Sequence, residues 1–166
     1  MDAPEFDFEE ILQEYLYALV PHKFMAKANE SITLSELCQL PLLLLSPATA
    51  LRASLDKAAQ QLGLTLQTKY QFSQAQTLVS MANAGLGVAI LPGLVVPETP
   101  ALNTHILLID TEADSPPKKG KVSVRNGPQP IYLTRKVGLV TLKGRSLSPA
   151  ALKLTEIVRK RIGINQ

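Results

Sequence analysis

The segment Leu42–Leu45 is an unbroken run of leucines between Pro41 and Ser46, and no polar side chain interrupts it. A strand exposed on one face alternates apolar and polar residues, whereas a strand covered on both faces of a parallel sheet is apolar throughout. A second apolar run, 86–91, ends at Pro92 and has the same character. The two runs predict an α/β fold in which helices cover both faces of a mostly parallel sheet.

Amphipathic segments between these runs predict the covering helices. After the turn 46–49, apolar residues recur at helical spacing, at Leu51, Leu55, Ala58 and Leu62. Gly63 is expected to end this helix as a left-handed cap. The segment 64–72 predicts a half-buried strand, with one face formed by Leu64, Leu66, Thr68, Tyr70 and Phe72. A further helix is expected to start near Ser73, to turn Leu78, Met81 and Ala82 inward, and to end at Gly85.

Capping signals locate two more helices. Thr33 and Glu36 form a capping-box pattern, which predicts a short helix over 34–39. Ser148 precedes Pro149 and predicts the start of a final helix. The expected core face of that helix consists of Ala151, Leu154, Val158 and Ile162. We interpret its basic end, 159–161, as support for the helix dipole and the acidic pair at 9–10 as a solvated face or frayed terminus.

Strands are also expected over 15–20 and 131–142. The stretch 110–130 has a different composition, with prolines and lysines in place of apolar periodicity. It predicts a long exposed loop.

Composition excludes several classes of protein. A formal net charge of +3 over 166 residues is too small an excess to indicate a nucleic-acid-binding surface. Cys38 is the only cysteine and is expected to be a buried, inert thiol, so we expect no disulfide, metal site or cofactor. The histidines, His22 at a surface or strand edge and His105 in a strand, have no triad partners, and we expect no catalytic site and no enzyme. The N-terminus is acidic and no apolar stretch reaches the ~20 residues of a membrane span, which predicts a cytoplasmic protein without membrane contact.

Two loops are candidate ligand sites on physical grounds, because ligands of α/β folds bind beyond the carboxyl ends of the strands, where helix N-termini present unpaired amides. The first loop contributes Ser46, Pro47, Ala48, Thr49 and Arg52, and the second contributes Phe72, Ser73 and Gln74. The alternative is that Ser46, Thr49 and Ser73 simply cap helices and that Arg52 is solvated.

Several stretches resemble the effector-binding domain of LysR-type regulators, in order and at plausible spacing over residues 10–163. Of these, the glycine-rich run 86–92 and the ending 147–151 are the more specific. The matching positions are Ile32-Thr-Leu-Ser-Glu-Leu37, the leucine run 40–45, Arg52, Asp56, Gly63, the stretch 78–92, and Arg145-Ser-Leu-Ser-Pro-Ala-Ala151.

The resemblance implies a periplasmic-binding-protein-like (type 2) effector domain, in which two α/β lobes enclose a small-molecule cleft. Residues 1–12 would be a remnant of the first lobe, 13–136 the complete second lobe, and 137–166 the returning strand and C-terminal helix of the first lobe. The first lobe would therefore be partial, and its last helix would have no complete sheet to pack on.

The family's second-lobe contacts come from the same two loops, which favours Ser46 and Thr49 as ligand contacts over caps, while Arg52 could equally face solvent. Hydroxyls and helix-start amides suit an anionic group on the effector. The implied function is a ligand-sensing regulatory domain that forms a homodimer or higher oligomer. It would reach DNA only through a helix-turn-helix preceding Met1 and absent from this chain. The alternative is a stand-alone solute-binding module of the same fold, which would need an export signal or a full two-lobe length.

Overall fold

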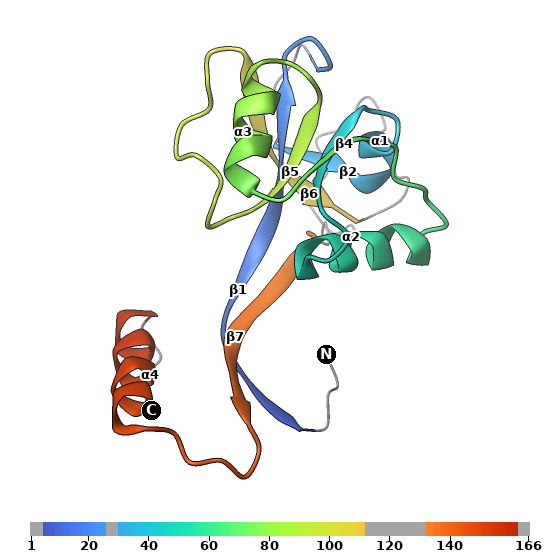
Figure 1. Ribbon diagram of the computed structural model, residues 1–166. Coiled ribbons are helices and arrows are strands. Elements are labelled where there is room, and N and C mark those ends of the chain that lie inside the picture. The colour runs from blue at the N-terminus through green and yellow to red at the C-terminus, as the bar shows by residue number, and fades with distance from the viewer. Residues whose placement is uncertain (1–4, 26–29, 112–131, 163–166) are drawn as a thin grey trace, which may run out of the picture. The chain divides into compact units, whose positions relative to one another are not determined.

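The computed structural model describes residues 5–25, 30–111 and 132–162. The chain divides into two compact units (Figure 1): unit 1 is Met1–Glu14 with Arg135–Gln166, and unit 2 is Tyr15–Thr134. Most of the loop expected at 110–130 lies outside the described residues. None of the helices in the described ranges has the length and apolar character needed to cross a membrane.

A mixed sheet forms the centre of unit 2, in the strand order β2-β6-β1-β5-β3-β4. β3 pairs in parallel with β4 and β5, and β2 pairs in parallel with β6, whereas β1 is antiparallel to both of its neighbours, β5 and β6. The predicted α/β fold is confirmed. The strands are β1 Phe6–Pro21, β2 Ser31–Thr33, β3 Leu42–Leu45, β4 Thr68–Phe72, β5 Val88–Pro92 and β6 Thr104–Asp110.

Helices cover both faces of this sheet: α1 Leu34–Leu37 and α2 Ala50–Gln61 on one face, and α3 Ala75–Asn83 on the other. Neighbouring side chains of a strand point to opposite faces. Leu42 and Leu44 accordingly pack with residues of α1 and α2, while Leu43 packs with residues of α3. The leucine run is therefore covered on both sides, as its lack of a polar face predicted.

The edge of the sheet differs from the sequence expectation. β4 begins at Thr68 instead of residue 64, and Tyr70, expected to face inward, is 45% exposed. β4 is the last strand in the order and pairs on one side only, so its alternation does not correspond to a buried face. Leu62 is exposed as well, because α2 buries Leu51, Leu55 and Ala59 instead. In α3 the inward residues are Leu78, Val79 and Ala82, while Met81 is only partly buried.

The predicted start of α1 and the glycine that follows α2 are confirmed, whereas α1 ends at Leu37, before the expected residue 39. The hydroxyl of Thr33 accepts from the amide of Glu36 at 3.1 Å, and that carboxylate accepts from the amide of Thr33 at 2.8 Å. Gly63 follows α2 with φ 67°, the left-handed conformation that side chains with a Cβ disfavour.

Unit 1 contains the first part of β1, most of β7 Thr134–Leu142, which pairs with β1, and α4 Pro149–Ile162. The hydroxyl of Ser148 accepts from the amide of Ala151 at 3.3 Å, which confirms the predicted N-cap of α4. The expected core face of α4 is wrong in part, because no residue of α4 is buried and Leu154 is 62% exposed. Within the described residues of unit 1, the two strands beside this helix are β1 and β7.

Ion pairs connect β1 to β7 and to α4 in unit 1. Arg159 of α4 donates from Nε and Nη2 to the carboxylate of Glu9 on β1, at 2.9 and 2.6 Å. Glu10 pairs with Lys136 of β7 at 2.7 Å. Both acidic residues are exposed, as expected for a solvated face, but they lie in a strand and are paired, so the frayed-terminus alternative was wrong. Arg159 makes an ion pair that its dipole role did not predict.

The β1–β7 ribbon carries exposed apolar side chains. They are Phe6, Phe8, Val140 and Leu142. A Cβ at Gly138 would lie 2.7 Å from the Phe8 ring and 2.2 Å from the carbonyl oxygen of Glu9, so only glycine fits there. β1 and β7 therefore approach closely at this point, with the Phe8 ring over the glycine.

Candidate functional site

The two candidate loops lie side by side at one edge of the sheet in unit 2. β3 and β4 are parallel, so the loop that leads into α2 and the loop that leads into α3 leave the sheet at the same edge. The amide of Ser46 donates to the carbonyl oxygen of Phe72 at 2.9 Å, which joins the two loops directly. The structure thus brings the N-termini of α2 and α3 to neighbouring positions.

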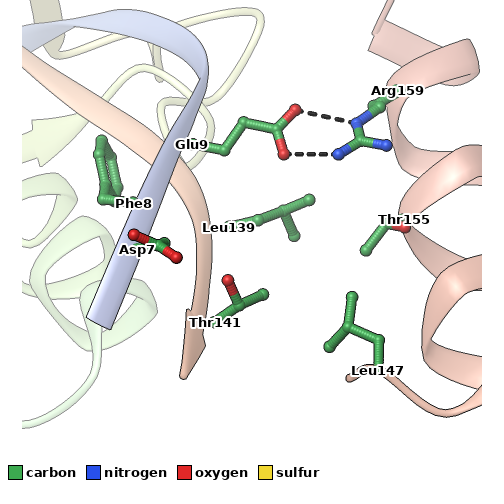
Figure 2. Close-up of a pocket in the computed structure, with 8 residues that line it drawn as sticks. All are labelled: Asp7, Phe8, Glu9, Leu139, Thr141, Leu147, Thr155 and Arg159. Carbon is green, nitrogen blue, oxygen red and sulfur yellow. Dashed lines mark hydrogen bonds and ion pairs between the residues drawn. The ribbon is translucent and has the colours of Figure 1, made fainter. Parts of the chain in front are cut away.

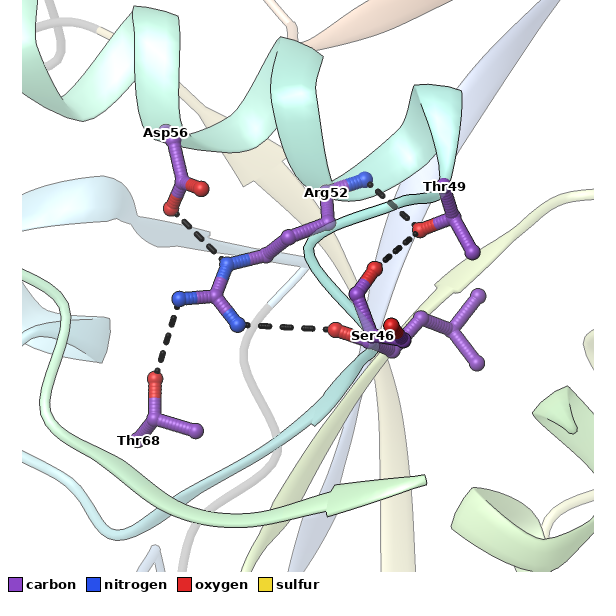
Figure 3. A network of polar contacts seen from close by, with 6 residues as sticks. Ser46, Thr49, Arg52, Asp56 and Thr68 are labelled. Atoms are coloured by element: carbon purple, nitrogen blue, oxygen red, sulfur yellow. Dashed lines mark hydrogen bonds and ion pairs between the residues drawn. The ribbon is translucent and has the colours of Figure 1, made fainter. Parts of the chain in front are cut away.

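Thr49 is the N-cap of α2, and its hydroxyl makes two hydrogen bonds (Figure 3). It accepts from the amide of Arg52 at 3.3 Å and donates to the carbonyl oxygen of Ser46 at 2.9 Å. The amide of Thr49 donates to that same carbonyl at 3.0 Å. These bonds close the turn and start the helix, which supports the capping alternative for Thr49.

The guanidinium of Arg52 turns back toward the strands, and the side chain is only 12% exposed. Its Nε donates to Oδ1 of Asp56 at 2.8 Å, its Nη1 to the carbonyl oxygen of Leu45 at 3.4 Å, and its Nη2 to the hydroxyl of Thr68 at 3.3 Å (Figure 3). Arg52 is therefore not a solvated first-turn residue, and its charge is paired with a carboxylate.

Several groups at this edge remain available to a ligand. The Ser46 side chain is half-buried, and among the described residues its hydroxyl has no hydrogen-bond partner. The amides of Ala50 and Leu51, in the first turn of α2, also have none within the described ranges. This set, a hydroxyl beside helix-start amides, can hold an anionic group.

The second loop is more open. Gln74, not Ser73, is the N-cap of α3, and its side chain makes no capping bond. Ser73 and Gln74 are exposed, Phe72 is half-buried, and Pro47 and Ala48 of the first loop are exposed. The structure therefore leaves the predicted residues of both loops accessible, except for the hydroxyl of Thr49 and the guanidinium of Arg52.

Sequence reasoning missed Asp56 and Thr68 as the partners of Arg52. The spacing of four residues between Arg52 and Asp56 was a usable signal, because side chains four apart on a helix are neighbours. Thr68 gave no such signal, since it lies in β4, outside the helix that contains Arg52 and Asp56.

The two histidines and the cysteine lie away from the two candidate loops in the sequence and add no ligand group to them. His22 is exposed and stacks on His105, with ring centroids 4.1 Å apart and a 32° tilt between the rings. The Nε2 atom of His105 is buried, with no partner in the part of the chain that the structure describes. Cys38 is buried as expected, and burial raises the pKa of its thiol.

A shallow pocket occurs in unit 1 between the ribbon and α4 (Figure 2). The Arg159 guanidinium that donates to Glu9 holds the pKa of that carboxyl below its ordinary value of 4.5. The charges of Glu9 and Arg159 are therefore paired with each other inside the pocket. Its lining residues are Asp7, Phe8, Glu9, Leu139, Thr141, Leu147, Thr155 and Arg159.

Comparison with known proteins identifies the family. The model of the LysR substrate binding domain matches residues 2–163. The chain belongs to this family. An uncharacterized HTH-type transcriptional regulator of Bacillus subtilis, YybE, is 28% identical over 138 residues, which is 83% of this chain and 40% of that protein. A second such regulator, YnfL of Escherichia coli, is 32% identical over 84 residues, 49% of this chain and 28% of that protein. The matched segments therefore cover less than half the length of each of these relatives.

Solved structures show the same fold. The effector binding domain of QuiR in complex with shikimate has a TM-score of 0.73 at 16% identity, and the match covers 99% of this chain and 68% of that one. The regulatory domain of CcmR from Synechocystis PCC6803, in complex with 2-PG, has a TM-score of 0.74 at 12% identity, with 98% and 69% covered. These LysR-type domains confirm the periplasmic-binding-protein-like fold.

Proposed function

We propose that this chain is the ligand-sensing part of a bacterial LysR-type regulator and that it binds a small anionic effector with the loops that follow β3 and β4. The observation that carries the proposal is the hydrogen bond from the amide of Ser46 to the carbonyl of Phe72. It brings two helix N-termini and the free hydroxyl of Ser46 to one edge of the sheet.

The charges at this edge favour an anionic ligand, although the cation of Arg52 is already paired with Asp56. The first turn of a helix has unpaired amides and carries a partial positive charge, which stabilises a carboxylate or phosphate placed there. Asp56 pairs with the charge of Arg52, so the helix ends supply the attraction. The similar domains of QuiR and CcmR hold shikimate and 2-PG, which fits small effectors of this kind.

The division of the chain into two units suggests which residues belong to each lobe of the effector domain. We propose that unit 2 is the second lobe of the effector domain and that unit 1 contributes the returning strand and last helix of the first lobe. The match to only 68% of the QuiR domain supports a partial first lobe. In the bacterial cytoplasm, DNA would be bound through a helix-turn-helix outside this chain, as the HTH-type names of the longer relatives suggest.

Self-association is the second part of the proposal. Exposed apolar patches on a protein surface are typical of interaction sites, and the ribbon of unit 1 exposes Phe6, Phe8, Val140 and Leu142. We expect a homodimer in size-exclusion chromatography with light scattering. A monomer at all concentrations across the micromolar range would contradict it.

Calorimetric titration with shikimate, inorganic phosphate and sulfate tests the anion site. If one of these anions binds, Ser46→Ala should raise its Kd, because the substitution removes the free hydroxyl. Ser54→Ala, an exposed serine further along α2, is the matched control and should bind as the wild type does. NMR of the bound probe should show no turnover. Failure of all three anions to bind at millimolar concentration, or equal effects of the two variants, would overturn the proposed site.

A further inference from the structure

Arg52 connects three elements around the first candidate loop. From α2 it reaches Asp56 in its own helix, the carbonyl oxygen of Leu45 at the end of β3, and the hydroxyl of Thr68 at the start of β4. Leu45 is the residue immediately before the loop, and Thr49, whose hydroxyl accepts from the amide of Arg52, ends it. The arginine therefore holds both ends of the loop 46–49.

We infer that Arg52 and Thr68 are positioning residues of the effector site, and that Arg52 is not its anion-binding cation. This inference rests on the proposed function. The guanidinium is a rigid planar fork whose donors fit several acceptors at once. By fixing the first turn of α2 against the end of β3, it holds the loop with Ser46 and the first-turn amides of Ala50 and Leu51 in place.

Burial and charge pairing favour this role over direct contact. The side chain of Arg52 is 12% exposed, and its Nε–H, Nη1 and Nη2 each have an acceptor within the protein. A ligand anion would have to compete with the carboxylate of Asp56, which lies at 2.8 Å. Lysine would keep the charge but has no planar fork, so it cannot serve Leu45 and Thr68 together.

The two roles predict opposite results for substitutions. If Arg52 positions the loop, Arg52→Lys and Arg52→Gln weaken anion binding equally, and Asp56→Asn weakens it too. If Arg52 contacts the anion, Arg52→Lys retains most of the binding, Arg52→Gln loses it, and Asp56→Asn strengthens it by releasing the charge. The second pattern would overturn the inference.

Thr68 provides the sharpest test, because it is outside the predicted ligand contacts. Thr68→Val removes the acceptor of Nη2 with little change in shape, and Thr68→Ser keeps it. We expect the shikimate Kd of Thr68→Val to rise about tenfold, the order expected for loss of one charge-assisted hydrogen bond, and that of Thr68→Ser to stay at the wild-type value. Equal affinities of the Val and Ser variants would refute the role of Thr68.

Hydrogen exchange in the ligand-free protein separates this inference from the proposed function. The amide of Ser46 donates to the carbonyl of Phe72, and the amide of Thr49 donates to the carbonyl of Ser46. The amide of Leu86, which follows α3, donates to the carbonyl of Met81 in that helix and serves as the control. Arg52→Lys and Thr68→Val should speed exchange at Ser46 and Thr49 and leave Leu86 unchanged. If shikimate fails to bind but these amides respond, the proposed ligand fails and the positioning role stands. Unchanged exchange at Ser46 and Thr49 overturns it.

Discussion

Replacement of Thr49 by valine tests how α2 starts. The Thr49 hydroxyl accepts from the amide of Arg52 at 3.3 Å and donates to the carbonyl of Ser46 at 2.9 Å, and valine can do neither. Loss of an N-cap side chain costs about 1 kcal/mol of unfolding free energy, within a range of roughly 0.5–2 kcal/mol. The Ser46 carbonyl keeps the Thr49 amide as a donor, so no buried acceptor is left alone and the estimate stays near the middle of that range.

Urea and thermal unfolding followed by circular dichroism measure this effect. For a chain of this size, about 1 kcal/mol corresponds to a fall in Tm of roughly 2–4 °C. Thr49→Ser keeps a capping hydroxyl and should unfold within a few tenths of a kcal/mol of the wild type. A hydroxyl that only contacts ligand would leave the unfolding midpoint of Thr49→Val unchanged and weaken anion binding alone. That result would refute the capping argument.

Further substitutions test the packing of each unit. Leu43→Ala should lower the unfolding free energy by about 2–5 kcal/mol because it leaves a cavity in the core, whereas Leu62→Ala, at an exposed position, should cost less than about 1 kcal/mol in the same urea series. Gly138→Ala places a Cβ 2.2 Å from a backbone oxygen, and the strain should destabilise unit 1 by about 1–3 kcal/mol; unchanged protease resistance of unit 1 would contradict this. Glu9→Gln removes the partner of Arg159. Because the ion pair lowers the pKa of Glu9, the wild type should be more stable than this variant above pH 4.5, and the difference should vanish as the pH falls through the folded-state pKa. A difference that does not change with pH would exclude the ion pair.

Local signals in the sequence predicted the centre of the fold. The leucine run predicted a strand covered on both faces, and its residues are divided between the two core clusters. The capping pattern of Thr33 and Glu36 and the cap at Ser148 were read correctly, because each involves groups within three residues of one another. The two candidate loops were found because parallel strands place their carboxyl ends at one edge of the sheet.

Long-range pairings were not predictable in the same way. Glu9 and Arg159 are 150 residues apart, and neither residue type at its position indicates the other. The full length of β1 was missed because its first part, 6–14, is rich in acidic and exposed residues that give no strand periodicity. The hydrogen bond from Arg52 to the hydroxyl of Thr68 joins α2 to β4, two elements whose contact no local spacing indicates. These features depend on which elements become neighbours, which a single sequence does not encode locally.

The most direct test of the effector site is a ¹H–¹⁵N NMR titration of the protein with shikimate, the molecule held by the similar QuiR domain. Binding at the proposed site predicts shift changes concentrated at the amides of Ser46, Ala50, Leu51, Ser73 and Gln74, with residues of α4 unaffected. Shift changes centred on the unit 1 pocket around Glu9 and Arg159, or no changes at saturating probe concentration, would contradict the proposed site.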